Sequence, residues 1–320
     1  MTTRILVTGA NGFVGLPLCL ALASAGHEVT ALQRRAAAAR VGVTPWVHAA
    51  SNFEGIDAAW PRGLSPECVV HLAARVHVMN DSAPDPIAAF RATNVDGTLR
   101  LARAAHANGA RRFVYVSSIK AVAETDGGTR LGEDAPARPE DPYGVSKREA
   151  EEALRALQRE TGLDVVIVRP PLVYGPGVSA NFLRLLRAVA KGVPLPLGAA
   201  HAQRSLVYVE NLAHALMQCA LDHRAANACF HVADEEDLSV AELLRKIGCH
   251  LDHPARLVSV PVSWLRIAGR LTGHTTQVER LTSDLRLDTS HIRRTLDWRA
   301  PYTTDDGLEA TVRWFRAPHP

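Results

Sequence analysis

The chain has 320 residues, 47% of them apolar, which is enough to bury a large core in one or two domains. Its 36 basic and 33 acidic residues are interspersed and leave a formal charge of +3, a pattern that gives no support for binding nucleic acid or a membrane surface. The absence of any run of 18 apolar residues predicts no membrane insertion, and five scattered cysteines without a C-x-x-C pair predict free thiols in a reduced, cytoplasmic setting.

The first predicted element is a short strand, residues 5–8, followed by a glycine-rich turn and an apolar helical pattern that reaches Ala25. Strand, glycine turn and helix in this order are the context that a dinucleotide-binding fingerprint requires. Glycine lets the backbone approach a pyrophosphate, and the helix N-terminus offers unpaired N–H groups. The spacing G-x-x-G-x-x-G differs from G-x-G-x-x-G, and a turn that binds nothing is the alternative. The predicted cofactor contacts here are Gly9, Asn11, Gly12, Phe13, Val14 and Gly15.

A second strand is predicted over residues 28–32, and Gln33, Arg34 and Arg35 follow it. An NAD site usually has an acidic residue at this point for the ribose 2′-hydroxyl, whereas an arginine accommodates the 2′-phosphate of NADP. Because no acid is present here, the sequence favours NADP(H) over NAD, with Arg34 as the candidate ligand. Two surface arginines that bind nothing are the alternative.

The next buried strand is predicted over residues 68–73. Small residues at its end would let a cofactor lie against it, which makes Leu72, Ala73 and Ala74 candidate cofactor contacts. Asn94 is a further candidate. It stands where a helix is predicted to begin and to run to Asn108, so the residue pattern by itself favours a helix cap.

Ser118 stands at the end of a strand predicted over residues 113–117, and Tyr143 follows 25 residues later, after a long polar loop over residues 121–142. Ligands of parallel α/β sheets bind at the carboxyl ends of strands, where a serine hydroxyl can hold a substrate oxygen near a phenol. A serine that only satisfies loop backbone is the alternative.

Tyr143 and Lys147 are four residues apart in a helical segment and therefore share one face. A neighbouring cation favours phenolate and lowers a tyrosine pKa by roughly 1 to 3 units. The pair therefore predicts an acid-base group assisted by a lysine. A surface tyrosine and lysine on an amphipathic helix are the alternative.

These motifs together resemble the extended short-chain dehydrogenases/reductases, in particular the NAD(P)-dependent nucleotide-sugar epimerase/dehydratase family, and are similar to UDP-glucose 4-epimerases. The stretches Arg169-Pro-Pro-Leu-Val-Tyr-Gly-Pro and Arg204-Ser-Leu-Val-Tyr-Val-Glu-Asn also match the family's pattern. The resemblance implies an α/β fold, a Rossmann-type doubly wound parallel sheet with a smaller, mostly C-terminal substrate-binding domain. Residues 1–170 would form the dinucleotide-binding domain, with about 204–233 returning to it, and the rest of 171–320 would be mostly the substrate-binding domain.

The resemblance also implies the roles of individual residues. Ser118, Tyr143 and Lys147 would be catalytic, with the last two also contacting the cofactor. Asn181 and Arg204 would join Ser118 in binding a nucleotide sugar. Ser205 and Pro171 replace the family's usual Asp and Asn, which leaves the other substrate contacts open. Family members are commonly dimers, so a homodimer is expected.

The resemblance implies hydride exchange at C4 of a nucleotide sugar, with a UDP-hexose or UDP-N-acetylhexose as the expected substrate. Ile119 and Lys120 follow Ser118 where dehydratases of the family carry Asp-Glu, which argues against dehydration. The sequence leans slightly to a 4-ketoreductase of surface-polysaccharide sugar synthesis with exchanging NADPH. A 4-epimerase with retained NAD is the alternative, and a non-catalytic dinucleotide sensor is a remote one.

The C-terminal half carries mostly structural signals. Ser239 and Glu242 form a capping-box pattern. A strand is predicted over residues 256–260, and helices over 262–271 and 305–316. The histidines of this half show no ligand spacing, so no metal site is expected.

Overall fold

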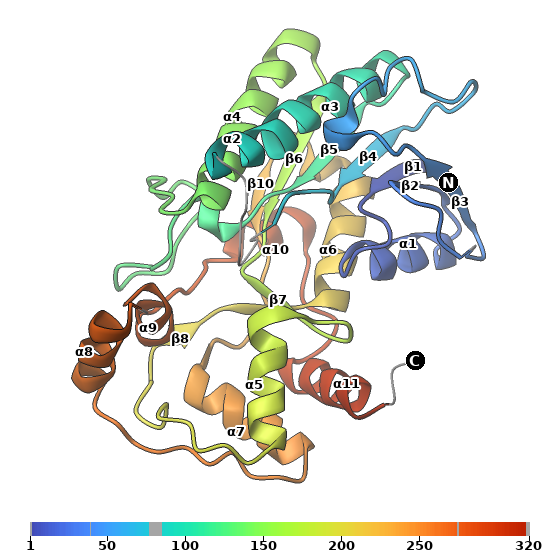
Figure 1. Ribbon diagram of the computed structural model, residues 1–320. Helices are drawn as coiled ribbons and strands as arrows, with labels where there is room; N and C mark the ends of the chain where they lie inside the picture. The colour runs from blue at the N-terminus through green and yellow to red at the C-terminus, as the bar shows by residue number, and fades with distance from the viewer. Residues whose placement is uncertain (1, 39, 77–84, 274, 318–320) are drawn as a thin grey trace.

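The computed structural model describes residues 2–38, 40–76, 85–273 and 275–317. Its centre is a parallel sheet of seven strands in the order β10-β6-β5-β4-β1-β2-β3 (Figure 1). The strands are β1 (Arg4–Thr8), β2 (Glu28–Gln33), β3 (Val43–Val47), β4 (Cys68–His71), β5 (Arg112–Val116), β6 (Asp164–Arg169) and β10 (Cys229–His231). The strand order reverses between β1 and β4, which is the switch point where doubly wound sheets bind ligands. The predicted Rossmann-type α/β fold is confirmed.

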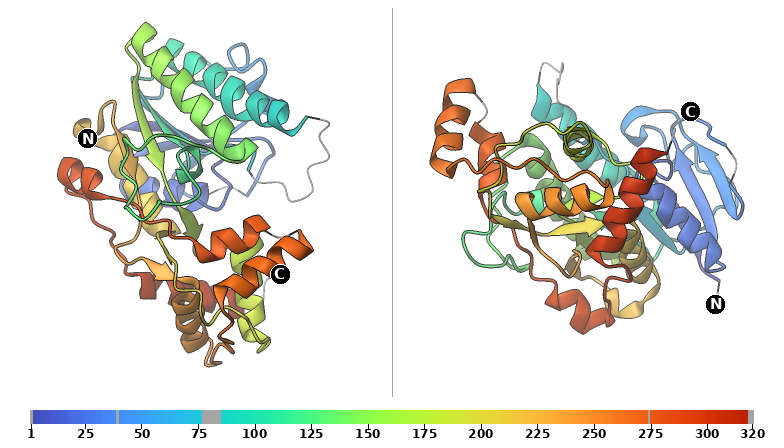
Figure 2. Two further views of the ribbon diagram at one scale, coloured as in Figure 1. Left: turned by 90° about the vertical axis from the view of Figure 1, so that its left-hand side faces the viewer. Right: turned by 90° about the horizontal axis from the view of Figure 1, so that it is seen from below.

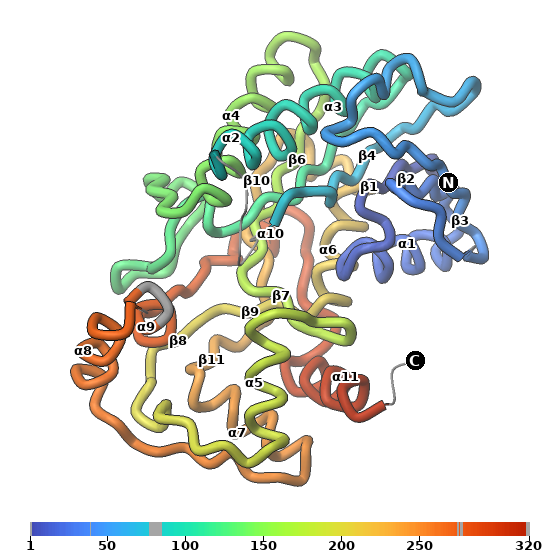
Figure 3. Tube along the Cα trace, in the orientation of Figure 1, coloured from blue at the N-terminus to red at the C-terminus, as the bar shows by residue number. Residues whose placement is uncertain are grey.

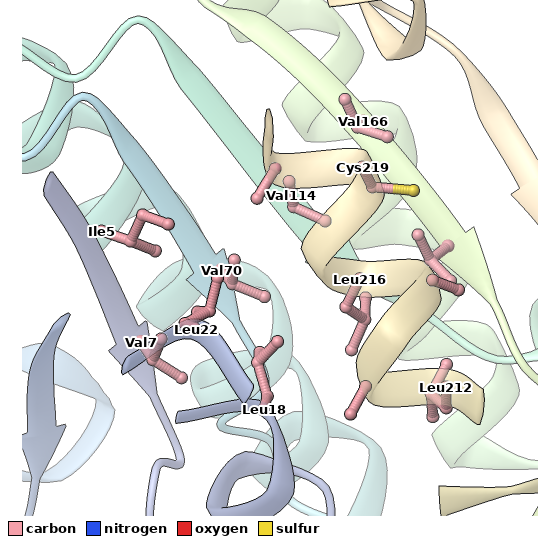
Figure 4. Close-up of a cluster of buried hydrophobic side chains, with 14 of the residues drawn as sticks. Ile5, Val7, Leu18, Leu22, Val70, Val114, Val166, Leu212, Leu216 and Cys219 are labelled. Atoms are coloured by element: carbon pink, nitrogen blue, oxygen red, sulfur yellow. The ribbon is translucent and has the colours of Figure 1, made fainter. Parts of the chain in front are cut away.

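Successive residues of these strands are buried in two different clusters, because side chains alternate between the faces of a sheet. Ile5 and Val7 of β1 belong to one cluster, shown in Figure 4, whereas Leu6 between them belongs to the other. Both faces of the inner strands are therefore covered, and their central residues are mostly apolar, as is typical of parallel sheets. The edge strand β3 is mostly exposed.

Helices cover both faces of the sheet (Figure 2). One face packs against α1 (Gly15–Ser24), α6 (Val209–Leu221) and α10 (Ser290–Leu296). The helices on the other side are α2 (Pro86–Arg91), α3 (Thr98–Ala107) and α4 (Pro142–Thr161). A π-helical turn, Ala92–Gly97, joins α2 to α3, and short 3-10 turns span Ser51–Phe53, Ile119–Ala121 and His223–Ala225.

A second lobe lies below the carboxyl ends of the strands (Figure 3). It contains β7 (Leu172–Tyr174) paired with β9 (Leu206–Tyr208), and β8 (Gln203–Arg204) paired with β11 (Leu238–Ser239). Its helices are α5 (Ala180–Ala190), α7 (Val240–His250), α8 (Val262–Thr272), α9 (Thr275–Thr282) and α11 (Thr304–Arg316). A third apolar cluster holds most of the lobe together, and α8 and α9 pack on each other at its outer edge.

The structure confirms some, but not all, of the elements predicted for the C-terminal half. The capping box is present, because Ser239 Oγ accepts from the Glu242 N–H and the Glu242 carboxylate accepts from the Ser239 N–H. The helices predicted over 262–271 and 305–316 are confirmed as α8 and α11. The strand predicted over 256–260 is wrong: only an isolated bridge from Leu257 to Leu195 forms, since no neighbouring strand continues the pairing.

In the part of the chain that the structure describes, no helix is long and apolar enough to cross a membrane. The same residues contain no group of three or more His, Cys, Asp or Glu side chains that would hold a metal ion.

Candidate active site

The glycine turn after β1 is closed by a backbone hydrogen bond between two of its own residues. The Gly12 N–H donates to the Gly9 carbonyl at 2.8 Å, and α1 begins at Gly15. A Cβ on Gly15 would lie 2.1 Å from the Gly9 carbonyl oxygen, and one on Gly9, which has φ +64°, would lie 3.0 Å from the Ala73 nitrogen. The turn thus has no room for side chains at Gly9 and Gly15 and presents bare backbone there at the start of a helix, which is a cradle for a pyrophosphate.

A hydrogen-bond chain fixes the end of β4 against this turn. Thr8 Oγ1 accepts the N–H groups of Leu72 and Ala73, so its own proton is donated to His71 Nδ1 at 2.8 Å. His71 Nε2 then donates to Thr98 Oγ1 at 3.0 Å. Burial lowers the pKa of His71 to about 3, so this imidazole is a neutral structural group.

The end of β2 carries a polar network at the position expected for the ribose 2′ group. Gln33 is buried and accepts a hydrogen bond from Asn11, whose side-chain oxygen accepts from Arg40 Nη1 at 2.6 Å. Arg34 lies exposed beside them. Arg40 is a cation that the sequence analysis missed, because the arginine returns to the turn from outside the predicted strand.

Asn94 does not cap a helix, and that interpretation is wrong. It lies inside the helical stretch that already begins at Pro86, because the π-helical turn continues α2 without a break. The buried side chain accepts from the Arg75 N–H at 2.8 Å and donates to the Arg75 carbonyl at 3.0 Å and to Ser146 Oγ at 2.9 Å. Asn94 therefore ties the loop after β4 to the helix that carries Tyr143.

Ser118 and Tyr143 meet at the carboxyl end of β5. Ser118 Oγ accepts the Lys120 N–H at 3.2 Å, which leaves the serine proton for the hydrogen bond with the Tyr143 phenol. Asp141 caps α4 by accepting the Gly144 N–H at 2.7 Å, and this fixes the turn on which Tyr143 stands.

The Lys147 ammonium is held by the backbone at the end of β5 and lies over two tyrosine rings. Its Nζ donates to the Val116 carbonyl at 2.8 Å and lies 4.7 Å from the Tyr115 ring centre and 5.9 Å from that of Tyr143. Burial lowers the pKa of Lys147 to about 7, against the opposing charge of Glu151.

The expected lowering of the tyrosine pKa is not found. Burial raises the pKa of Tyr143 to about 12, although the hydrogen bond from Ser118 opposes the shift; the Asp141 carboxylate raises it further. Desolvation of the phenol is the largest of these effects.

An ion pair that the sequence analysis missed lies beneath these residues. Glu151 is two helical turns after Tyr143 on the same face of α4, and it pairs with Arg169 at the end of β6 and accepts from Ser117 Oγ at 2.6 Å. The spacing of Glu151 from Lys147, again four residues, was a signal that a buried acid follows the lysine.

The two proposed substrate contacts lie in the second lobe. Asn181 is exposed in the first turn of α5. Arg204 in β8 is partly buried and donates through Nη1 to the carbonyls of Arg280 (2.8 Å) and Ser283 (3.1 Å). These contacts bring Arg280 of α9, which the sequence analysis did not single out, next to Arg204.

Three comparisons agree with this architecture. The sequence model of the NAD dependent epimerase/dehydratase family matches residues 5–233. A Vibrio cholerae UDP-glucose 4-epimerase is 40% identical and covers 98% of this chain and 96% of its own. A Pseudomonas aeruginosa UDP-2-acetamido-2,6-beta-L-arabino-hexul-4-ose reductase is 27% identical over 76% of this chain and 56% of its own length.

Among solved structures, the Thermus thermophilus UDP-glucose 4-epimerase in complex with NAD has a TM-score of 0.76 at 25% identity, covering 98% of this chain and 99% of that one. The family match spans well over half of the sequence, including the glycine turn, Ser118, Tyr143 and Lys147. The protein is therefore an NAD(P)-dependent enzyme, and its chain belongs to the NAD-dependent epimerase/dehydratase family.

Proposed function

We propose that the protein inverts C4 of a UDP-hexose or UDP-N-acetylhexose, as a 4-epimerase. The observation that carries the proposal is the hydrogen-bonded pair of Ser118 and Tyr143 at the carboxyl end of β5, in the same sheet edge as the glycine turn after β1. The Vibrio cholerae relative, which matches nearly the whole chain, supports epimerisation over the ketoreductase that the sequence favours.

The residues of the glycine turn fit a nicotinamide dinucleotide, because the turn leaves backbone without side chains at a helix N-terminus. Gly9, Gly12 and Gly15 would hold the pyrophosphate, with Asn11, Phe13 and Val14 beside it. Leu72, Ala73 and Ala74 would line its path, and Asn94 would hold that loop in place. When bound, the nicotinamide would supply hydride-transfer chemistry at the sugar C4.

The chain's own groups would handle the proton. Ser118 Oγ would donate to the C4 oxygen, and Tyr143 Oη, in its phenolate form, would take the proton from a C4 hydroxyl and, as the resulting phenol, return it. Lys147, held by the Val116 carbonyl, would bind the nicotinamide ribose. Asn181 and Arg204 would hold the diphosphate of the substrate.

A 4-ketoreductase is the second candidate, and the end of β2 favours it. No acid is present there, and Arg34 and Arg40 are available for the 2′-phosphate of NADPH. The Pseudomonas aeruginosa reductase supports the same activity.

One experiment separates the two activities. The purified protein is incubated with UDP-glucose and with UDP-N-acetylglucosamine, and the products are identified by NMR, while the bound cofactor is extracted and identified by mass spectrometry. Inversion at C4 with retained NAD supports the epimerase. No inversion, together with oxidation of added NADPH by a UDP-4-keto-6-deoxy-N-acetylhexosamine, rejects the epimerase in favour of the reductase. Inactivity in both assays rejects both.

We also propose the domain division and assembly stated above. Residues 1–170 with about 204–233 would bind the dinucleotide and the remainder of 171–320 mostly the sugar. Pairing of β10 with β6 and packing of α6 on α1 support this division for residues 209–231, whereas β8 and β9 pair with strands of the second lobe. The expected homodimer is tested by light scattering.

A further inference from the structure

Four charged side chains form one cluster beside the candidate active site. Lys120 Nζ lies 2.6 Å from Asp141 Oδ2 and 2.8 Å from Glu124 Oε1. Arg280 Nη2 lies 3.1 Å from the same Glu124 oxygen and 3.4 Å from the same Asp141 oxygen. Each cation thus touches both acids, and the acids are the more buried members, with 8% and 16% of their side chains exposed.

The cluster is connected to both reacting groups through the backbone. Lys120 donates its N–H to Ser118 Oγ, and Asp141 uses its other carboxylate oxygen to cap the Gly144 N–H. The loop and the helix are packed so closely that a Cβ on Gly144 would lie 2.4 Å from the Lys120 carbonyl oxygen. The side-chain bond from Lys120 to Asp141 therefore joins the segment that bears Ser118 to the turn that bears Tyr143.

Arg280 brings the second lobe into the same cluster. It belongs to α9, and its carbonyl accepts from Arg204 Nη1 at 2.8 Å. Lys120, Glu124 and Asp141 come from the other side, more than 130 residues earlier in the chain. The Asp141 carboxylate thus receives one cation from its own lobe and one from the lobe proposed to bind the sugar.

The charge of Asp141 acts on Tyr143 itself. The carboxylate raises the pKa of the phenol, after the larger effect of burial and against the hydrogen bond from Ser118. The other titratable or charged groups near the phenol are Lys147 on α4 and Tyr115 on β5; Arg75 lies over the Phe90 ring, whose edge packs against Tyr143. Neutralising Asp141 would remove a charge that opposes phenolate formation.

We propose that Lys120 and Arg280 are positioning residues for the proton transfer: they clamp Asp141 from two lobes, hold the first turn of α4 against the Ser118 segment, and neutralise the carboxylate that faces Tyr143. One of the two cations is on α9. The packing of the α8–α9 pair against the cluster is therefore coupled to the ability of Tyr143 to form phenolate. The proposal depends on the proposed function only for the role of Tyr143 in catalysis.

A matched control exists in the same region. Arg286 Nε pairs with Asp126 Oδ2 at 2.7 Å, between the same long loop and the same C-terminal segment, with 26% and 0% of the side chains exposed. Arg286→Met breaks a comparable ion pair without touching Asp141. Its effect on the Tyr143 midpoint therefore measures what breaking an ion pair with a purely structural role would do.

The test compares Lys120→Met, Asp141→Asn, the double variant and Arg286→Met, each with bound NAD. Asparagine still caps a helix, so Asp141→Asn removes the charge and keeps the turn. Phenolate is measured by ultraviolet absorbance against the same variant carrying Tyr143→Phe, over a series of alkaline pH values at which circular dichroism shows every variant folded. No substrate is needed, so inactivity on every sugar tested would reject the proposed function and leave this result standing.

We expect Lys120→Met to raise the Tyr143 midpoint by about 1 unit and to lower its phenolate fraction, Asp141→Asn to do the opposite, and the double variant to return close to the wild type. With an active substrate, Lys120→Met should lower kcat at neutral pH by about tenfold with KM nearly unchanged, and Lys120→Arg should restore it. The proposal is overturned if the two single variants shift the midpoint in the same direction, or if neither differs from Arg286→Met.

Discussion

Arg169 and Glu151 form a two-bond ion pair in the interior. Arg169 Nε donates to Glu151 Oε1 at 2.9 Å and Nη2 donates to Oε2 at 2.6 Å, with 1% and 0% of the side chains exposed. The pair joins the middle of α4, one helical turn after Lys147, to the end of β6. Burial raises the pKa of Glu151, but the hydrogen bonds and charge of Arg169 outweigh burial and hold the pKa below its usual value.

Glu151→Gln should destabilise the fold by about 3 kcal/mol, because it leaves the Arg169 charge buried without its counter-ion. The measurement is the free energy of unfolding in urea. Glu149→Gln is the control on the same helix: it breaks the exposed pair with Arg91 and should change stability little. Equal effects of the two variants would contradict a structural role for the buried pair.

The strands β1, β2, β4 and β5 were predictable from sequence because each is a short, mostly apolar run bounded by turn residues, whereas β3, which contains Thr44 and Pro45, was not predicted. The cofactor turn was recognisable because Gly9, Gly12 and Gly15 stand between a strand and a helix. Its close packing against Ala73 was not, since that contact joins residues far apart in the chain.

The parts of the site that escaped prediction depend on tertiary contacts. Arg280 and Asp141 are in contact although they are 139 residues apart in the sequence, and no sequence pattern predicts a contact over that separation. The pKa of Tyr143 likewise depends on how far the phenol is buried from water, and the motif Tyr-x-x-x-Lys does not specify that burial. Asn94 was misassigned because a π-helical turn continues a helix where the sequence indicates a new start.

Stability should fall as the solution is acidified from pH 6.5 towards 4. Burial lowers the pKa of His71 to about 3 and that of His231 to about 4, from an ordinary value of 6.5. In this window the unfolded chain binds protons that the folded chain does not, so stability rises with pH, by up to about 1.4 kcal/mol per unit for each histidine. Unfolding in urea at several pH values measures the slope, and His231→Gln should reduce it. An unchanged slope would contradict the assignment.

Gly15→Ala should abolish cofactor binding and destabilise the turn by about 2 kcal/mol, because the added methyl would collide with the Gly9 carbonyl at 2.1 Å. Gly132→Ala is the control, since a Cβ there meets no atom within 4 Å and the residue has no positive φ. Calorimetric titration with NAD and thermal unfolding check both effects. Retained binding in Gly15→Ala would exclude this turn as the pyrophosphate site.

Arg34→Gln and Arg40→Gln should weaken NADPH binding by about tenfold each and leave NADH binding nearly unchanged, if these arginines hold a 2′-phosphate. Arg40 is the sharper probe because its guanidinium already lies 2.6 Å from Asn11 Oδ1 in the cofactor turn. Fluorescence titrations with NADPH and with NADH give the ratio of the two affinities for each variant. Equal losses for NADPH and NADH would instead assign Arg40 to the shared part of the dinucleotide.

Tyr143→Phe should lower turnover by roughly 10² to 10⁴, because it removes the group that exchanges the C4 proton, while NAD affinity changes little. Ser118→Ala should also lower turnover, since the serine hydroxyl hydrogen-bonds the phenol and would hold the substrate oxygen. Turnover is measured with whichever UDP-sugar the NMR assay shows to be converted, and affinity by calorimetry. A dinucleotide sensor would respond differently: the tyrosine variant would keep its cofactor response and lose nothing measurable, because no proton would be moved.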